Sequence, residues 1–210
     1  MNDFRQDRNE PHLEDTSFSP QAFTLAAVLF EAFLAGIAAA GGYLLDFPVS
    51  KTFEPHWADF GIGLAAALPF ILLFLLICRI PIGPFRRLLQ SIDQVVIPRF
   101  RGCHFTDLLA ISITAGIGEE MLFRGLIQGY LTESIGGSFG IVVGLVVASL
   151  LFALMHPMTA TYAMVAGVIS LYLGWIWLLT GNLLVPITAH AFYDFVVLIY
   201  LVRFRKPAGG

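Results

Sequence analysis

The chain has 210 residues, of which 57% are hydrophobic and 13% are charged, and its formal net charge is −3. That charged share is about half the share found in soluble domains, and the apolar residues form successive runs of about twenty, so a soluble globular fold is excluded. The predicted fold class is all-α: an integral membrane helical bundle with about six transmembrane helices.

The predicted elements begin after a polar tail. Residues 1–21 are polar and acidic and offer little to bury, so we expect them to be disordered or to lie at the membrane surface. The six predicted spans cover residues 22–45, 59–78, 105–131, 139–156, 159–179 and 183–202. They form a single transmembrane domain over residues 22–202, which is followed by a short basic tail, 203–210.

The segment between the second and third spans is rich in arginine. Its middle part, 85–96, alternates apolar and polar residues at helical spacing, which is typical of an amphipathic helix on the membrane surface. A plain structured loop is the other interpretation. With six crossings this segment and both termini share one side and hold most of the basic residues, so the positive-inside rule places both termini in the cytoplasm. The basic residues flank membrane ends, and no nucleic-acid partner is expected. Cys78 and Cys103 fall near the same side, where reducing conditions disfavour a disulfide.

The third span contains "GEEMLFRG", which places Glu119, Glu120 and Arg124 among apolar and small residues. Each charge at mid-membrane costs about 2.5–3.5 kcal/mol on insertion scales, so these side chains must face the bundle interior or water. Glu120 and Arg124 are four residues apart and can pair on one helix face, whereas Glu119 projects about 100° away from Glu120. Glu119 is then a free carboxylate suited to accept a proton. A purely structural pair, with Glu119 facing a water pocket, is the alternative.

Two further sets of residues carry imidazoles. The fourth span ends in "LLFALMHP", so His156 lies where Pro157 breaks the helix and could be functional or a capping residue. In the sixth span, "HAFYD" puts His190 and Asp194 four residues apart on one face. An aspartate one turn from a histidine is suited to orient the imidazole; a self-satisfied pair packed against its neighbours is the alternative.

Together the three sets supply a base, two imidazoles and a second carboxylate from three different spans. That inventory suits activation of water and stabilisation of a tetrahedral oxyanion, as peptide hydrolysis requires. Simple span geometry puts Glu119 near mid-membrane, His156 near the cytoplasmic end and His190 nearer the outer side, so a shared site needs tilted or broken helices.

A non-enzymatic function is the main alternative. Buried carboxylates and histidines also make proton relays, so the same cluster could serve a proton-coupled transporter or a non-proteolytic membrane scaffold or immunity protein. Glu31, in the first span, adds to that interpretation, although a polar contact between helices also accounts for it. The spans show no evident internal repeat of the kind many transporters carry.

The three motifs also resemble those of a known family. "EEMLFR" matches Glu-Glu-x-x-x-Arg, "FALMH" matches Phe-x-x-x-His, and "HAFYD" matches His-x-x-x-Asn/Asp, in that order, over about residues 104–200. The chain is similar in these features to the CPBP intramembrane proteases, also called the CAAX prenyl protease and bacteriocin-processing or Abi family.

The resemblance implies an all-helical endopeptidase, in a bacterial cytoplasmic membrane, that acts on a membrane-associated protein or peptide. By position, Glu119 and His156 would activate the attacking water, Glu120 and Arg124 would shape the site, and His190 and Asp194 would stabilise the oxyanion or bind substrate. Members that process prenylated proteins usually have Asn where this chain has Asp194. A carboxylate donates no hydrogen bond unless protonated, which favours an orienting role toward His190.

The family resemblance also raises a possible metal. Its members are often labelled metalloproteases, and Glu119, His156 and His190 would provide one carboxylate and two imidazoles, a set that suits zinc. No His-Glu-x-x-His sequence occurs, however, and a metal-free activation of water by glutamate uses the same residues. Both mechanisms stay open at the level of the sequence.

Overall fold

The computed structural model describes residues 19–80 and 82–205. Most of the predicted polar tail, up to residue 18, and the end of the basic tail, from residue 206, lie outside the described residues. Within the described part the fold is helical and contains no strand, which confirms the all-α fold class.

The helices follow one another with short connections. Their bounds are α1 (Pro20–Leu44), α2 (Trp57–Ala66), α3 (Leu68–Arg79), α4 (Gly83–Ser91), α5 (Ile97–Phe100), α6 (Phe105–Glu120), α7 (Gly129–Ile135), α8 (Gly137–Leu154), α9 (Ala160–Thr180) and α10 (Leu184–Ile199). A short 3₁₀ helix, η1, covers Val49–Thr52, and three π-helical segments cover η2 (Ile92–Val96), η3 (Met121–Gln128) and η4 (Tyr200–Phe204).

Five helical stretches in the described residues are long and apolar enough to cross a membrane. They are Pro20–Leu44, Trp57–Arg79, Gly137–Leu154, Ala160–Thr180 and Leu184–Phe204, and they correspond to five of the six predicted spans. The remaining predicted span, 105–131, differs because it carries ionisable residues and a π-helical segment. It is still helical from Phe105 to Ile135, through α6, η3 and α7, and packs between α1 and α10.

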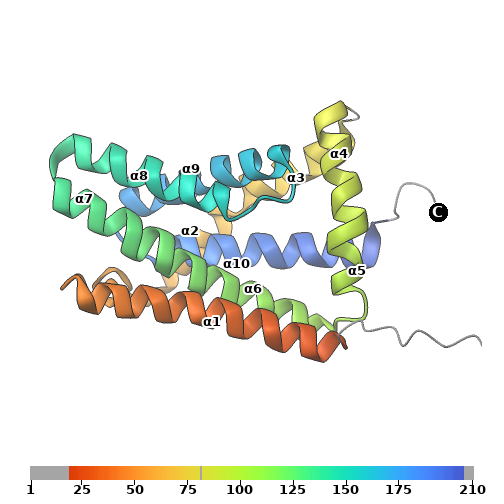
Figure 1. The fold of residues 1–210 in the computed structure, drawn as a ribbon, viewed down its shortest axis with the longest axis horizontal. Helices are drawn as coiled ribbons and strands as arrows, with labels where there is room; N and C mark the ends of the chain where they lie inside the picture. The colour runs from red at the N-terminus through yellow and green to blue at the C-terminus, as the bar shows by residue number, and fades with distance from the viewer. Residues whose placement is uncertain (1–18, 81, 206–210) are drawn as a thin grey trace, which may run out of the picture.

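Most of the helices run along the long axis of the molecule, and α4 and α5 cross their ends (Figure 1). The crossing segment is helical from Gly83 to Phe100, so the predicted amphipathic helix at 85–96 is present and the loop alternative is wrong. Its apolar residues Leu88, Ile92 and Ile97 are buried against the bundle. The segment Gly83–Phe100 therefore covers one end of the helix bundle (Figure 1).

Two glycines bring the neighbouring helices close to α6. A Cβ atom on Gly118 would overlap the backbone oxygen of Glu31 on α1. A Cβ atom on Gly116 would come within 2.9 Å of the backbone oxygen of Ile187 on α10. Because neither glycine has a side chain, α1 and α10 both pack directly on the turn of α6 that precedes the Glu119–Glu120 pair.

Candidate active site

The predicted pair of Glu120 and Arg124 is present at the junction of α6 and η3. Arg124 Nη1 donates a hydrogen bond to Glu120 Oε1 at 2.9 Å, and both side chains are completely buried. The π-helical segment η3 begins at Met121, directly after Glu120. Irregular π turns of this kind occur frequently at functional sites. The paired charges offset each other in a region where an isolated charge would be costly, while Glu120 Oε2 and Arg124 Nε have no hydrogen-bond partner among the described residues.

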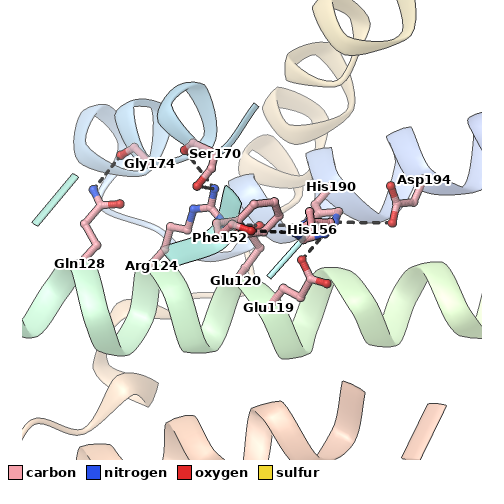
Figure 2. A network of polar contacts seen from close by, with 10 residues as sticks. All are labelled: Glu119, Glu120, Arg124, Gln128, Phe152, His156, Ser170, Gly174, His190 and Asp194. Carbon is pink, nitrogen blue, oxygen red and sulfur yellow. Dashed lines mark hydrogen bonds and ion pairs between the residues drawn. The ribbon is translucent and has the colours of Figure 1, made fainter. Parts of the chain in front are cut away.

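Arg124 also ties η3 to two other helices (Figure 2). Its Nη2 donates to the backbone oxygen and to the hydroxyl oxygen of Ser170 on α9, each at 2.9 Å. The guanidinium carbon lies 5.0 Å from the centre of the Phe152 ring on α8, a cation–π contact. Arg124 therefore links η3 to α8 and α9.

Glu120 makes a second contact, with His190 on α10. Its Oε1 lies 2.7 Å from His190 Nδ1. The Glu120 carboxylate, which is paired with Arg124, accepts hydrogen bonds, so His190 Nδ1 carries a proton and donates it to Glu120. The second ring nitrogen, Nε2, is then left for contacts with other groups. The sequence predicted Asp194 as the residue that orients His190. Asp194 Oδ2 lies 3.5 Å from Nε2, but the shortest carboxylate contact to the ring comes from Glu120.

Glu119 lies next to this pair with one oxygen unpaired. Its Oε2 is 3.9 Å from His190 Nε2, and the side chain is 13% exposed. Among the described residues this oxygen has no hydrogen-bond partner, although it is enclosed. Glu119 is therefore a carboxylate free to interact with a molecule that enters the site.

His156 lies in the turn after α8 and is held by Phe152. Its Nδ1 is 2.7 Å from the Phe152 backbone oxygen, and since a carbonyl oxygen only accepts, Nδ1 donates and Nε2 is left as an acceptor. The His156 ring stacks on the Phe152 ring at 4.5 Å. Phe152 also contacts the His190 ring edge-on at 6.1 Å, so one phenyl ring positions both imidazoles.

At least one residue from each of the three motifs lines one cavity of about 330 Å³, whereas Glu120 and Arg124 do not line it. Glu119, His156, His190 and Asp194 all line it, so the tilt and packing of the helices overcome the different depths expected from the spans. Its remaining wall is mostly apolar and extends to the crossing helices, with Phe74, Ile77, Leu88, Ile92 and Leu201 among its residues. A polar cluster at the side of an apolar cavity is the usual form of a ligand site.

Sequence reasoning did not assign two residues to this site, Glu31 and Ser170. Glu31 on α1 lines the same cavity, and its Oε2 has no hydrogen-bond partner among the described residues. A signal existed, because Glu31 is a charged residue inside an apolar span. Ser170 gave no such signal, since a serine in a membrane helix is common and its role depends on Arg124 lying beside it.

Glu119, His156 and His190 are the residues that would bind a metal if one is present. Among residues 19–80 and 82–205, no group of three His, Cys, Asp or Glu side chains is arranged to hold a metal ion. Glu119, His156 and His190 line one cavity but do not form a preformed metal site. Cys78 and Cys103 are both free thiols.

Comparison with known proteins supports the resemblance drawn from the motifs. The family described as type II CAAX prenyl endopeptidase Rce1-like matches residues 102–196. The uncharacterized protein YpbD of Bacillus subtilis (strain 168) is 36% identical over 93 residues, which cover 42% of this chain and 42% of that relative. The chain thus spans less than half the length of this curated relative. No solved structure matches the chain. Residues 102–196, the segment that holds all six candidate site residues, are therefore similar to the Rce1-like family of endopeptidases.

Proposed function

We propose that this protein is an intramembrane endopeptidase that hydrolyses a peptide bond in a membrane-associated protein or peptide, with water activated by Glu119. The family match supports peptide hydrolysis. The observation that carries the mechanism is the enclosed, unpaired Glu119 Oε2 in a cavity that His156, His190 and Asp194 also line. Five apolar helices support an integral membrane protein, and the distribution of basic residues, with Phe105–Ile135 as a sixth crossing, supports cytoplasmic termini.

In the first step Glu119 acts as the general base. It accepts a proton from water while the water oxygen forms a bond to the carbonyl carbon of the scissile peptide, and the carbonyl electron pair moves onto its oxygen. His156 Nε2 is left as an acceptor at the same cavity, because Nδ1 is held by the Phe152 carbonyl. It can accept a hydrogen bond from the hydroxyl group of the tetrahedral intermediate, once the other proton of the water has passed to Glu119.

In the second step the tetrahedral intermediate collapses. The C–N bond breaks, and the proton held by Glu119 passes to the leaving nitrogen, so that the products are a carboxylic acid and an amine; the acid then passes its proton to the amine, which gives a carboxylate and an ammonium group. His190, when protonated on Nε2, donates a hydrogen bond to the oxyanion before this collapse. Glu120 holds the opposite edge of the ring at Nδ1, and Asp194 lies 3.5 Å from Nε2.

The charged pair supports the reaction indirectly. Arg124, on η3, donates hydrogen bonds to Glu120 and to Ser170 on α9, and it thereby fixes the Glu120 carboxylate. Glu120 in turn fixes the His190 ring. Neither Glu120 nor Arg124 needs to exchange a proton with substrate in this mechanism. Their role is to hold the His190 imidazole where the oxyanion forms. The imidazole can then stabilise the negative charge of the oxyanion without moving during the reaction.

The substrate is best found by comparing peptides from cells that express the wild-type protein or the Glu119→Ala variant. Mass spectrometry of membrane and secreted fractions should reveal cleavage products that are present only with the wild-type protein. The variant should insert and accumulate normally, because the contact of Glu119 with His190, at 3.9 Å, is too long for a hydrogen bond, and the buried pair of Glu120 and Arg124 is left intact. Identical peptide profiles with equal protein levels would instead favour the scaffold or transporter function that the same ionisable cluster could serve.

A further inference from the structure

Glu31 is a carboxylate of the cavity that lies outside the family-matched segment. It is on α1, whereas the family match covers residues 102–196. Its side chain lines the same cavity as Glu119, His190 and Asp194. Its Oε2 is enclosed and has no hydrogen-bond partner among the described residues. No motif and no relative assigns a role to this residue.

The packing of α1 on α6 fixes where Glu31 lies. Leu34 and Ala38, three and seven residues further along α1, are buried, so Glu31 begins the stripe that faces the bundle. Phe30 and Phe33, on the neighbouring faces, are 52% and 64% exposed. The missing side chain of Gly118 lets the Glu31 backbone sit directly against α6, next to Glu119. The carboxyl of Glu31 is therefore held at the cavity wall by backbone packing.

The cavity contains two carboxyl oxygens that need a hydrogen-bond donor. Glu31 Oε2 and Glu119 Oε2 are both enclosed and both without a partner in the described structure. The two carboxyls also interact electrostatically with each other and with His190. Buried polar groups are normally satisfied by protein or by ordered water. A single water molecule has two O–H donors and can satisfy one oxygen from each carboxyl.

We propose that Glu31 is a further active-site residue that holds the attacking water together with Glu119. Glu31 accepts one O–H of the water and Glu119 accepts the other, which directs a lone pair of the water oxygen toward the scissile carbonyl. The proton is transferred to Glu119, and Glu31 has the same protonation state before and after the step. This inference rests on the proposed peptidase function, and it adds a residue from α1 to a site otherwise built from α6, α8 and α10.

The test compares Glu31→Leu and Glu31→Gln with the wild-type protein in liposomes of the same lipid composition. The substrate is a peptide identified by the cellular comparison, and the readouts are kcat, KM and the unfolding temperature. Leucine removes a buried polar group from an apolar wall, so Glu31→Leu should keep or raise the unfolding temperature while kcat falls about tenfold or more. KM should change little, because the water and not the substrate loses its contact.

The glutamine variant separates water binding from a structural effect. Gln keeps one acceptor oxygen on a side chain of the same length, so Glu31→Gln should have a kcat between those of the leucine variant and the wild type. Glu133→Gln is the matched control, because Glu133 is an exposed glutamate on α7 and the same change there should leave kcat unaltered. Wild-type kcat in Glu31→Leu would overturn the proposal. The proposal would also be overturned if kcat fell equally in Glu31→Leu and Glu31→Gln and both variants had a lower unfolding temperature than the wild type.

The inference and the proposed function fail in distinguishable ways. If Glu119→Gln is inactive but Glu31→Leu has the wild-type kcat, the peptidase mechanism stands and the role of Glu31 is wrong. If Glu119→Gln keeps full activity, the proposed general base is wrong whatever the Glu31 variants do. If Glu31→Leu does not accumulate, Glu31→Gln alone decides, because a lowered kcat at unchanged stability supports the proposal and an unchanged kcat contradicts it.

Discussion

Glu120 and His190 are 70 residues apart in the chain, yet Glu120 Oε1 lies 2.7 Å from His190 Nδ1. The same oxygen accepts a hydrogen bond from Arg124. One buried carboxylate therefore joins the first motif to the third, and it links the charged pair that stabilises the bundle to the imidazole of the candidate site. Variants of this carboxylate should affect both stability and activity.

The first prediction concerns the buried pair. Glu120→Ala and Arg124→Ala should each lower the yield and the unfolding temperature, because each leaves an unpaired charge in the bundle, a loss of about 3–5 kcal/mol for buried pairs. Arg124→Lys should also be destabilised, since an ammonium group cannot reproduce the fork that reaches both Glu120 and Ser170. Thermal unfolding in detergent measures the effect.

A matched control for the pair is Glu54→Gln, because the Glu54 side chain is 70% exposed and its contact with His56 lies at the surface. This variant should unfold at the wild-type temperature, as exposed ion pairs contribute little. Wild-type stability in both alanine variants would show that the Glu120–Arg124 contact does not support the fold.

The second prediction concerns Asp194. Asparagine has the same shape and still offers an oxygen to His190 Nε2, and it adds a donor that a carboxylate lacks. Asp194→Asn should therefore retain activity within about tenfold of the wild type, whereas Asp194→Leu should lose much more. Initial rates on a peptide substrate measure this. Equal loss in both variants would mean that the negative charge of Asp194 is required in itself.

The third prediction concerns the contact between α1 and α6. Gly118→Ala adds a Cβ atom where the Glu31 backbone oxygen lies, so α1 must move away, at about 1–3 kcal/mol for an overpacked contact. Both the unfolding temperature and the activity should fall. Gly36→Ala, also in a membrane helix but with open space around its Cβ position, is the control and should be neutral or slightly stabilising. Unchanged behaviour of Gly118→Ala would rule out this close approach.

The fourth prediction concerns metal removal. Because no three donor side chains among the described residues converge on one point, activity of the purified protein should persist after treatment with a strong chelator. Activity is measured before treatment, after it, and after adding back zinc. A loss that zinc alone reverses would show that Glu119, His156 and His190 rearrange around a metal, the other mechanism that the sequence leaves open.

Most of the candidate site residues could be predicted from the sequence, because a charged residue inside an apolar span is costly and such residues are therefore few. Helical spacing also predicts the two local contacts, Glu120 with Arg124 and His190 with Asp194, and both are present. These predictions rely only on residues four positions apart, where the geometry of one helix decides which side chains meet.

The contacts between helices could not be predicted in the same way. The approach of Glu120 to His190, and of Arg124 to Ser170, depends on how α6, η3, α9 and α10 pack, and spacing within one helix carries no information on that packing. The position of Glu31 at the cavity likewise depends on α1 lying against Gly118. The helical state of residues 85–96 stayed ambiguous because a short amphipathic pattern also fits a loop.

The most direct test of the central claim is the turnover number of the Glu119→Gln variant on a peptide that the wild-type protein cleaves, measured in liposomes with equal amounts of folded protein. Glutamine keeps the size of the side chain but is a far weaker base than a carboxylate, so kcat should fall by about 100-fold or more at an unchanged unfolding temperature. Glu133→Gln should cleave at the wild-type rate. A Glu119→Gln protein that also cleaves at the wild-type rate would contradict the proposal that Glu119 activates the water.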